Sequence, residues 1–282
     1  MQYAPVFLQE DIMVIDFHTH LFPEKIAAKA LHQLAVTSGI TPSTDGTAAG
    51  LLSSMERCGI DISVVLPVVT TPHQYDSILR FASQINEENA GKKEHRLLSL
   101  GGIHPDCEDI PGKIAQLVRE GFKGIKLHPH YQGVAFDDIR YLRILDEASA
   151  QGLFVLTHAG YDPVAPDHDY CSVDMIMNAL SQITPYRLIL AHLGSNCNYQ
   201  ESLDRLCGLN VYMDTGYSLS NIPDDLFVRM VHKHGADKIL FATDCPWAHP
   251  DVFLQRIRNL TGISQEEKDL ILYGNASVLL GV

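Results

Sequence analysis

His18 and His20 are separated by one residue and follow an apolar, β-branched segment at residues 13–17. In an extended chain, residues two apart point to the same side. Both imidazoles would therefore reach one face, where they could bind a single divalent ion. This pair is the first half of a candidate metal site.

Other residues with metal-binding or acid–base side chains also close apolar runs. A set that recurs in this position along the chain indicates a site assembled from the ends of many strands. The members outside the first pair are His104, His128, His158, His192 and Asp244, and Lys126 lies within the run that His128 closes.

The elements that must position these residues form a regular series. Eight apolar segments have the length of strands: residues 12–17, 62–69, 97–103, 124–127, 153–157, 187–191, 210–214 and 238–243. Segments with helical spacing lie between them: residues 75–89, 110–120, 137–151, 173–183, 199–207 and 223–234. Strands that alternate with helices predict an α/β fold, a single (β/α)8 TIM barrel over residues 1–282. The predicted site would lie at the carboxyl ends of its strands, where barrel enzymes carry out their chemistry.

Two longer segments are expected to add to this plan. Residues 21–59 exceed one ordinary crossover and should hold an extra helix or a lid, and residues 264–280 should form one or two closing helices.

Composition limits the partners of the protein. The 282 residues are 46% hydrophobic and carry a formal charge of −13, which argues against binding to nucleic acid or to an anionic membrane surface. No apolar stretch approaches the roughly 20 residues that span a bilayer. The six cysteines form no CxxC pair, and no signal peptide precedes Asp11. We therefore expect a cytoplasmic protein that acts on a small molecule.

Four motifs carry a resemblance to a known family. They are IDFHTH at residues 15–20, GFKGIKLHP at 121–129, AHLG at 191–194 and FATD at 241–244. The chain resembles the amidohydrolase superfamily, in particular the branch of aminocarboxymuconate-semialdehyde decarboxylase and related metal-dependent hydrolases. The resemblance implies that His18, His20, His158 and Asp244 bind a metal. It also implies that His192 is either a pocket acid/base or a ligand of a second ion, and that a homodimer could form.

The predicted ligands suit a particular chemistry. Imidazole nitrogens with one carboxylate favour Zn²⁺ or a similar ion, with a position left for water. A bound ion lowers the pKa of that water towards about 7. Asp244 could then accept the proton from the attacking water, and His192 could orient the water or stabilise an oxyanion.

Lys126 leaves the number of metals open. In some members of the superfamily a lysine in this strand is carboxylated and bridges two ions, so Lys126 and His192 could help to hold a second metal. Lys126 could instead pair with a substrate carboxylate. We favour one metal. His104, His128 and Trp247 are weaker candidates for contacts with substrate.

Two reactions follow from these residues. The first is hydrolysis of an amide, lactone or ester of a small polar substrate by metal-activated water, which we favour. The alternative is non-oxidative decarboxylation of a small unsaturated or aromatic acid. A decarboxylase needs a cation to hold the departing carboxylate, and Lys126, Lys25 and Arg57 are the candidates near the barrel mouth.

Overall fold

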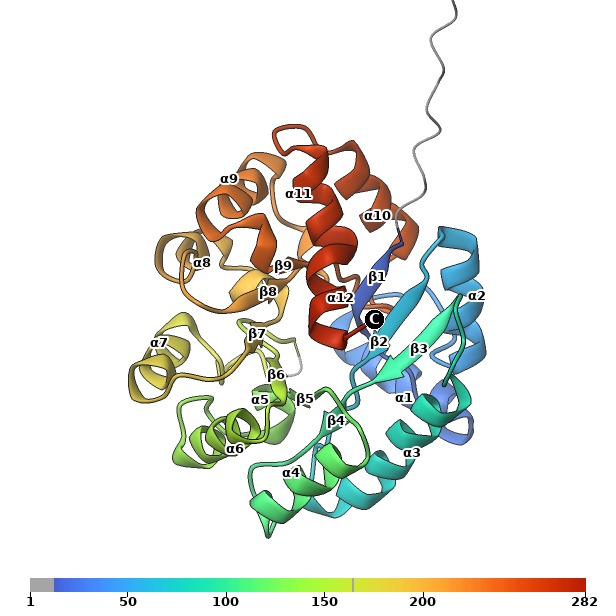
Figure 1. Cartoon of the computed structure of the whole chain (residues 1–282), viewed down its shortest axis with the longest axis vertical. Coiled ribbons are helices and arrows are strands. Elements are labelled where there is room, and N and C mark those ends of the chain that lie inside the picture. Colours follow the sequence, from blue (N-terminus) through green and yellow to red (C-terminus); the bar gives the residue numbers. More distant parts are fainter. Residues whose placement is uncertain (1–12, 164) are drawn as a thin grey trace, which may run out of the picture.

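The computed structural model describes residues 13–163 and 165–282, and its strands form a ring of parallel strands surrounded by helices (Figure 1). The predicted (β/α)8 barrel is confirmed. The expected beginning of the first strand at residue 12, and the segment before Asp11, lie outside the described residues. The strands are β1 (Ile15–Thr19), β2 (Ile62–Val65), β3 (Arg96–Ser99), β4 (Gly101–Gly102), β5 (Gly124–Leu127), β6 (Phe154–Thr157), β7 (Leu188–Leu190), β8 (Tyr212–Asp214) and β9 (Ile239–Leu240).

Backbone hydrogen bonds close the ring. β3 and β4 are two parts of one barrel strand, because β3 pairs with β2 and β4 pairs with β5, with Leu100 between them. The last strand returns to the first through the bonds from Phe17 N to Phe241 O and from Asp244 N to His18 O. The carboxyl ends of the first and last barrel strands therefore meet, which brings His18 and Asp244 together.

Helices cover the outside of the ring (Figure 1). The six predicted helices are confirmed, and the long segment after β1 holds an extra helix, α1, before α2. The prediction missed α10, whose proline at the first turn starts a helix rather than ending one. A short helix, α5 (Pro129–Gln132), which was not predicted, follows β5, and His128 lies between them as its N-cap. The helices are α1 (Glu24–Ser38), α2 (Ala48–Cys58), α3 (Tyr75–Glu88), α4 (Ile110–Arg119), α5 (Pro129–Gln132), α6 (Ile139–Ala150), α7 (Val173–Gln182), α8 (Tyr199–Arg205), α9 (Asp224–His234), α10 (Pro250–Asn259), α11 (Gln265–Asp269) and α12 (Asn275–Leu280).

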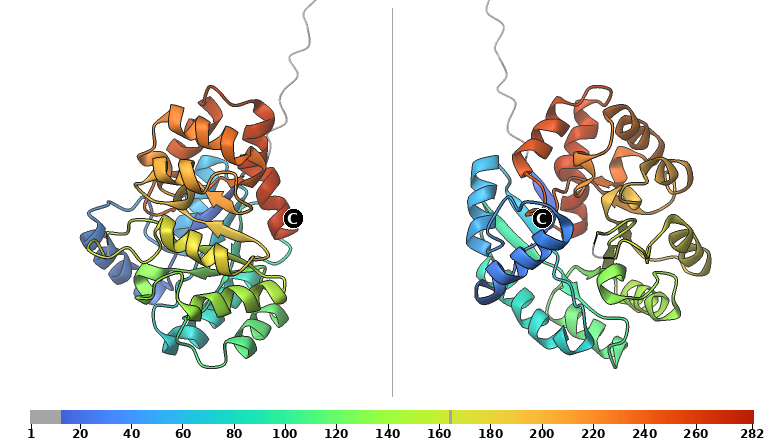
Figure 2. Two further views of the ribbon diagram at one scale, coloured as in Figure 1. Left: turned by 90° about the vertical axis from the view of Figure 1, so that its left-hand side faces the viewer. Right: turned by 180° about the vertical axis from the view of Figure 1, so that it is seen from behind.

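The interior of the barrel is apolar toward the amino ends of the strands. α12 packs into this region and closes it, while α1 lies at the opposite end of the barrel, as Figure 2 shows. Because α1 follows the carboxyl end of β1, the α1 end is the face where the predicted site belongs. The apolar interior is formed by Ile15, Phe17, Ile62, Val64, Leu66, Leu100, Phe154, Leu156, Ile189, Ala191, Leu240 and Ala242, with Ala276, Leu279 and Leu280 of α12.

Two further features concern the chain as a whole. Across the described ranges, no helix has the length and apolar character needed to cross a membrane. The six cysteines are all unpaired.

Candidate metal centre

The alternation of side chains in the strands carries polar residues into the barrel above the apolar interior. Phe154 and Leu156 point inward, so His158, two residues further on, continues the same face. Leu240 and Ala242 likewise lead to Asp244. The apolar layer and the polar layer therefore lie one above the other on the same inward face of the strands.

The first strand reaches this layer through an irregularity. Between Asp16 and Thr19, β1 has one residue more than the facing segment of β2, which is the pattern of a β-bulge. Such bulges re-aim side chains and often lie next to functional sites. The structure brings the Nε2 atoms of His18 and His20 close together, and the bulge contributes to this as well as the alternation of side chains.

His18, His20 and Asp244 form the first ligand group. The His20 Nε2 atom lies 3.1 Å from His18 Nε2 and 3.1 Å from Asp244 Oδ1, and His18 Nε2 lies 3.5 Å from the same oxygen. Ligands about 2.1 Å from a tetrahedral ion are about 3.4 Å apart, so these separations suit one first-row divalent cation.

The hydrogen bonds behind the two rings leave both Nε2 atoms as electron-pair donors. His18 Nδ1 donates to Asp214 Oδ2 at 2.8 Å, and His20 Nδ1 donates to the Leu66 carbonyl at 3.0 Å. In a neutral imidazole the other nitrogen then carries a lone pair. Two lone pairs and a carboxylate oxygen face one another, and this arrangement calls for a cation between them.

The protonation states agree with a metal site. Burial lowers the pKa of His18 well below its usual value, which keeps the ring neutral. Burial raises the pKa of Asp244, but the neighbouring imidazoles of His18 and His20 outweigh it and hold that pKa at about 2. A neutral imidazole and an ionised carboxylate are the forms that bind metals.

Asp214 is a site residue that the sequence analysis did not select. It is fully buried at the end of β8 and also accepts hydrogen bonds from the backbone N–H groups of His192 (3.0 Å) and Gly216 (2.9 Å). It thus orients His18 and fixes the start of the His192 segment. A signal was available, because Asp214 closes an apolar strand in the same way as Asp244.

Asp16 and Thr243 hold the ends of the first and last barrel strands together. Thr243 donates to Asp16 through its backbone N–H (2.9 Å) and its hydroxyl (2.5 Å). The next residue, Asp244, has a φ of 66°, a conformation that costs a non-glycine residue energy. The Asp16 contacts therefore help to fix the carboxylate that completes the ligand group.

Lys126 enters the same site from β5. Its side chain is fully buried, and its Nζ lies 3.3 Å from His18 Nε2. Burial lowers the pKa of Lys126 to about 8, although the charges of Asp214, Asp244 and Asp162 raise it. Lys126 is therefore the cation that faces the first ligand group.

His192 and His158 lie beside this group. His192 Nε2 is 3.0 Å from His158 Nδ1, and the ring centroids of His192 and His18 are 5.3 Å apart. His192 has a φ of 56°, so its position is also a strained one.

His158 belongs to a second ligand group together with His128 and Asp162, and does not join the His18 group. Three of the four predicted ligands are thus brought together by the structure, and the fourth lies across the site. That His158 binds the same ion stays a prediction.

The weaker candidates differ in their placement. His128 is buried, with its ring stacked between those of Tyr131 (3.9 Å) and His158 (4.4 Å). His104 is also buried, and its Nδ1 accepts the backbone N–H of Asp106 at 3.0 Å, which favours the role of ending a strand. Trp247 is half-buried in the turn after Asp244, to whose carbonyl its backbone N–H donates at 2.8 Å.

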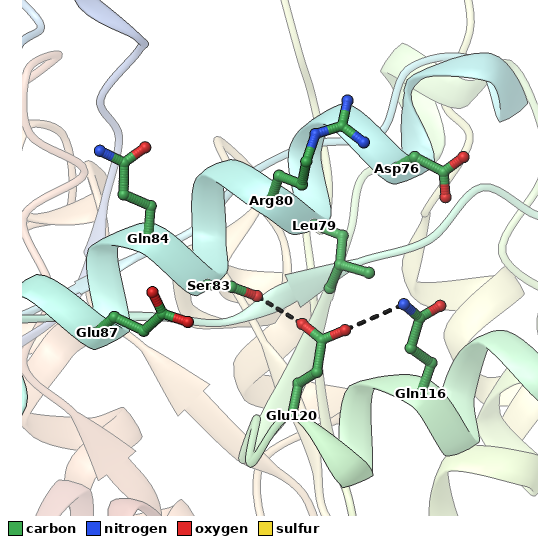
Figure 3. A pocket seen from close by; sticks show the side chains of 8 residues that line it. All are labelled: Asp76, Leu79, Arg80, Ser83, Gln84, Glu87, Gln116 and Glu120. Atoms are coloured by element: carbon green, nitrogen blue, oxygen red, sulfur yellow. Dashed lines mark hydrogen bonds between the residues drawn. The ribbon is translucent and has the colours of Figure 1, made fainter.

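A surface hollow between α3 and α4 lies away from this site. Figure 3 shows that it is lined mainly by polar side chains, and that Glu120 accepts hydrogen bonds from Ser83 and Gln116. The bond from Ser83 joins α3 to the end of α4, and no residue of the two ligand groups lines the hollow.

Comparisons with known proteins identify the family of the chain. The family model described as amidohydrolase matches residues 15–282. No curated protein sequence gives a significant match.

Solved structures share the fold over nearly the whole chain. An uncharacterised TIM-barrel protein from Bordetella bronchiseptica is 17% identical, with a TM-score of 0.76, and the match covers 96% of this chain and 99% of that one. The 2,6-dihydroxybenzoate decarboxylase from Rhizobium is 15% identical, with a TM-score of 0.67 and coverage of 96% and 99%. A 5-carboxyvanillate decarboxylase from Novosphingobium aromaticivorans, solved with bound manganese, is 13% identical, with a TM-score of 0.70 and coverage of 97% and 98%. From its fold and the family model, the chain belongs to the amidohydrolase family.

Proposed function

We propose that the protein is a metal-dependent carboxy-lyase that removes carbon dioxide from a small aromatic or unsaturated acid. The sequence favoured hydrolysis, with decarboxylation as the alternative. The structure moves our preference to the alternative because of one observation: a buried cation, Lys126, lies beside the first ligand group. The other two cations considered, Lys25 and Arg57, are exposed on α1 and α2.

In this reaction the metal ligands and Lys126 would have different roles. A divalent ion held by His18, His20 and Asp244 would supply positive charge for oxygen atoms of the substrate. The ammonium group of Lys126 would pair with the carboxylate that leaves. The carbon–carbon bond breaks, carbon dioxide departs, and the electron pair left on the substrate carbon takes a proton.

His192 is suited to deliver that proton. Its Nδ1 donates to the Gly216 carbonyl at 2.7 Å, so Nε2 is the nitrogen that can gain and lose a proton. Asp244 is a poor proton source, because its pKa is held at about 2 and it stays ionised at neutral pH.

The solved relatives support this proposal. Two of them, from Rhizobium and Novosphingobium aromaticivorans, are decarboxylases of aromatic acids, and the second contains manganese. Their likeness to this chain rests on the fold, so the substrate of the protein has to be found by experiment.

Hydrolysis is a second candidate, because an ionised Asp244 is also a good proton acceptor. In that reaction the Asp244 carboxylate takes the proton from water that attacks an amide, lactone or ester. The same site residues would serve, with Lys126 holding a substrate carboxylate away from the bond that breaks.

A substrate screen separates the two reactions. Protein loaded with Mn²⁺ or Zn²⁺ is incubated in D₂O with hydroxybenzoates, with 5-carboxyvanillate and with a set of lactones and aryl esters. We expect carbon dioxide release from an aromatic acid, with deuterium at the carbon that lost the carboxylate. Ester or lactone cleavage without carbon dioxide release would overturn the proposal in favour of hydrolysis.

Replacing Lys126 tests the proposed decarboxylation more specifically than the substrate screen does. Lys126→Met should lower the rate of carbon dioxide release by at least ~10²-fold, since it removes the charge that binds the reacting group. Lys123→Met is the matched control, because Lys123 is exposed just before the same strand. Equal losses in both variants would show that Lys126 has no special part.

A further inference from the structure

A continuous series of rings leads from the first ligand group to α5. Neighbouring ring centroids are 5.3 Å apart for His18 and His192, 4.7 Å for His192 and His158, 4.4 Å for His158 and His128, and 3.9 Å for His128 and Tyr131. The four histidines are buried, whereas Tyr131 is half-buried. Tyr131 is therefore the outermost member of the series, where the buried site meets solvent.

The hydroxyl of Tyr131 differs from those of the buried tyrosines. Tyr75, Tyr141 and Tyr199 each donate the hydroxyl to a protein oxygen, at 2.9, 2.5 and 3.3 Å. A buried tyrosine usually has such a partner. Within the described part of the chain, the Tyr131 hydroxyl makes no hydrogen bond. It is therefore available to a ligand.

Tyr131 and Lys126 share the same charged surroundings. Burial raises the pKa of Tyr131, and the charges of Asp162 and Asp244 raise it further. Burial lowers the pKa of Lys126, and the charges of Asp214 and of the same two carboxylates oppose this effect. A small molecule bound by Lys126 would therefore lie near the Tyr131 hydroxyl, which is protonated at neutral pH and can donate a hydrogen bond.

The position of Tyr131 is fixed by Gln132, the next residue along the chain. The Gln132 side chain is buried and makes four hydrogen bonds. Its amide nitrogen donates to the Val69 and Ile103 carbonyls, both at 2.8 Å, and its amide oxygen accepts from the His128 N–H at 3.1 Å and from the Tyr141 hydroxyl at 2.5 Å. These bonds tie α5 to the segments that follow β2 and β4 and to α6. A side chain on an anchored segment pays little entropy when it binds a ligand.

We propose that Tyr131 determines substrate specificity by donating its hydroxyl hydrogen to an oxygen substituent on the ring of the aromatic acid. This inference rests on the proposed function, in which Lys126 binds the carboxylate of the same acid. Lys126 is fully buried and Tyr131 is at the outer end of the ring series. The oxygen bound by Tyr131 would therefore be remote from the carboxylate, in the meta or para position. The substrate class is then a benzoic acid with a hydroxyl or alkoxy group in one of these positions.

Binding of unreactive analogues tests the proposal without turnover. Phenylphosphonate and its meta-hydroxy and para-hydroxy derivatives cannot release carbon dioxide. Their affinities for metal-loaded wild type and Tyr131→Phe are measured by calorimetry. We expect a hydroxy derivative to bind the wild type more tightly than phenylphosphonate does. Tyr131→Phe should weaken the binding of that derivative by roughly 3–10-fold, the contribution of a neutral hydrogen bond, and should leave the binding of phenylphosphonate unchanged.

Two controls separate the hydroxyl from the fold. Tyr131→Phe keeps the ring that stacks on His128, so its metal content and its thermal unfolding should match those of the wild type. Tyr186→Phe removes the hydroxyl of an exposed tyrosine just before the amino end of β7 and should change none of the three affinities.

Three results would overturn the proposal. The first is a wild type that does not bind phenylphosphonate or its derivatives. The second is a wild type that binds no hydroxy derivative more tightly than phenylphosphonate. The third is a Tyr131→Phe variant that weakens the binding of all three compounds alike, or of none. The outcome for the proposed function is separate, because that function is judged by carbon dioxide release in the substrate screen.

Discussion

The two ends of the barrel strands differ in chemistry although they belong to the same pleat. Toward the amino ends, Phe154, Leu156, Leu240 and Ala242 fill the interior, and α12 covers them. Toward the carboxyl ends, the same inward face carries imidazoles, carboxylates and Lys126. One set of strands can therefore provide stability at one end and chemistry at the other. Substitutions at the two ends should therefore have different consequences.

The apolar end should give the largest effect on stability. Phe154 is 2% exposed and packs its ring 5.8 Å from that of Phe17. Phe154→Ala removes a large buried side chain and should lower the free energy of unfolding by about 3–5 kcal/mol. Denaturant unfolding in the presence of a chelator measures this loss. Val36→Ala, at a position that is 70% exposed, should change stability little.

The polar end should show the reverse pattern. Asp244→Asn weakens the first ligand group and removes an acid–base side chain, so one equivalent of metal should be lost and activity should fall by about 10²–10⁴-fold. The unfolding of the metal-free variant should stay close to that of the metal-free wild type. A variant that loses activity because it unfolds would remove the distinction between the two ends.

Some of the features behind these two predictions could be predicted from the sequence, and others could not. The eight strands and the placement of His18, His20 and Asp244 at their ends could be predicted, because apolar runs and their terminal polar residues are local properties of the sequence. Asp214 also closes a strand and could have been selected in the same way. Its bond to His18 could not be predicted, because the two residues are far apart along the chain.

The second ligand group could not be predicted either. Its third member, Asp162, is positioned by the loop after β6, whose shape cannot be predicted from its residue types. The resemblance implies that His158 binds the same ion as His18, His20 and Asp244, and this stays a prediction.

Replacing Asp214 should have a smaller effect at the polar end, limited to metal affinity. Asp214→Asn keeps the size of the side chain but weakens the bond that orients His18, and outer partners of this kind affect metal affinity by about 10–100-fold. Competition with a chromophoric chelator measures the affinity. Asp204→Asn, on the exposed side of α8, should leave it unchanged. An unchanged affinity in Asp214→Asn would mean that His18 is oriented by packing alone.

We expect the smallest effect from His234, which lies outside both ends of the barrel strands and acts on the pH dependence of stability. Burial lowers the pKa of His234 to about 4, and its Nε2 has no hydrogen-bond partner in the described part of the protein. The unfolded chain thus binds more protons than the folded one between about pH 4 and pH 6.5, and stability should fall as pH decreases through this window.

Replacing His234 should weaken this dependence. In metal-free protein, His234→Gln should reduce the change in unfolding free energy between pH 7 and pH 4 by about 1–2 kcal/mol. His232→Gln, at an exposed neighbouring position, should not. An identical pH profile in both variants would assign the dependence to the polar end of the barrel instead.

We propose that the polar end of the barrel is a metal centre built on His18, His20 and Asp244. The most direct test is the metal content of the purified wild type, His20→Ala and Asp244→Asn, measured by plasma mass spectrometry after gel filtration. We expect at least one equivalent of a first-row divalent metal in the wild type, and one equivalent less in each variant. Equal metal content in the three proteins would contradict the claim.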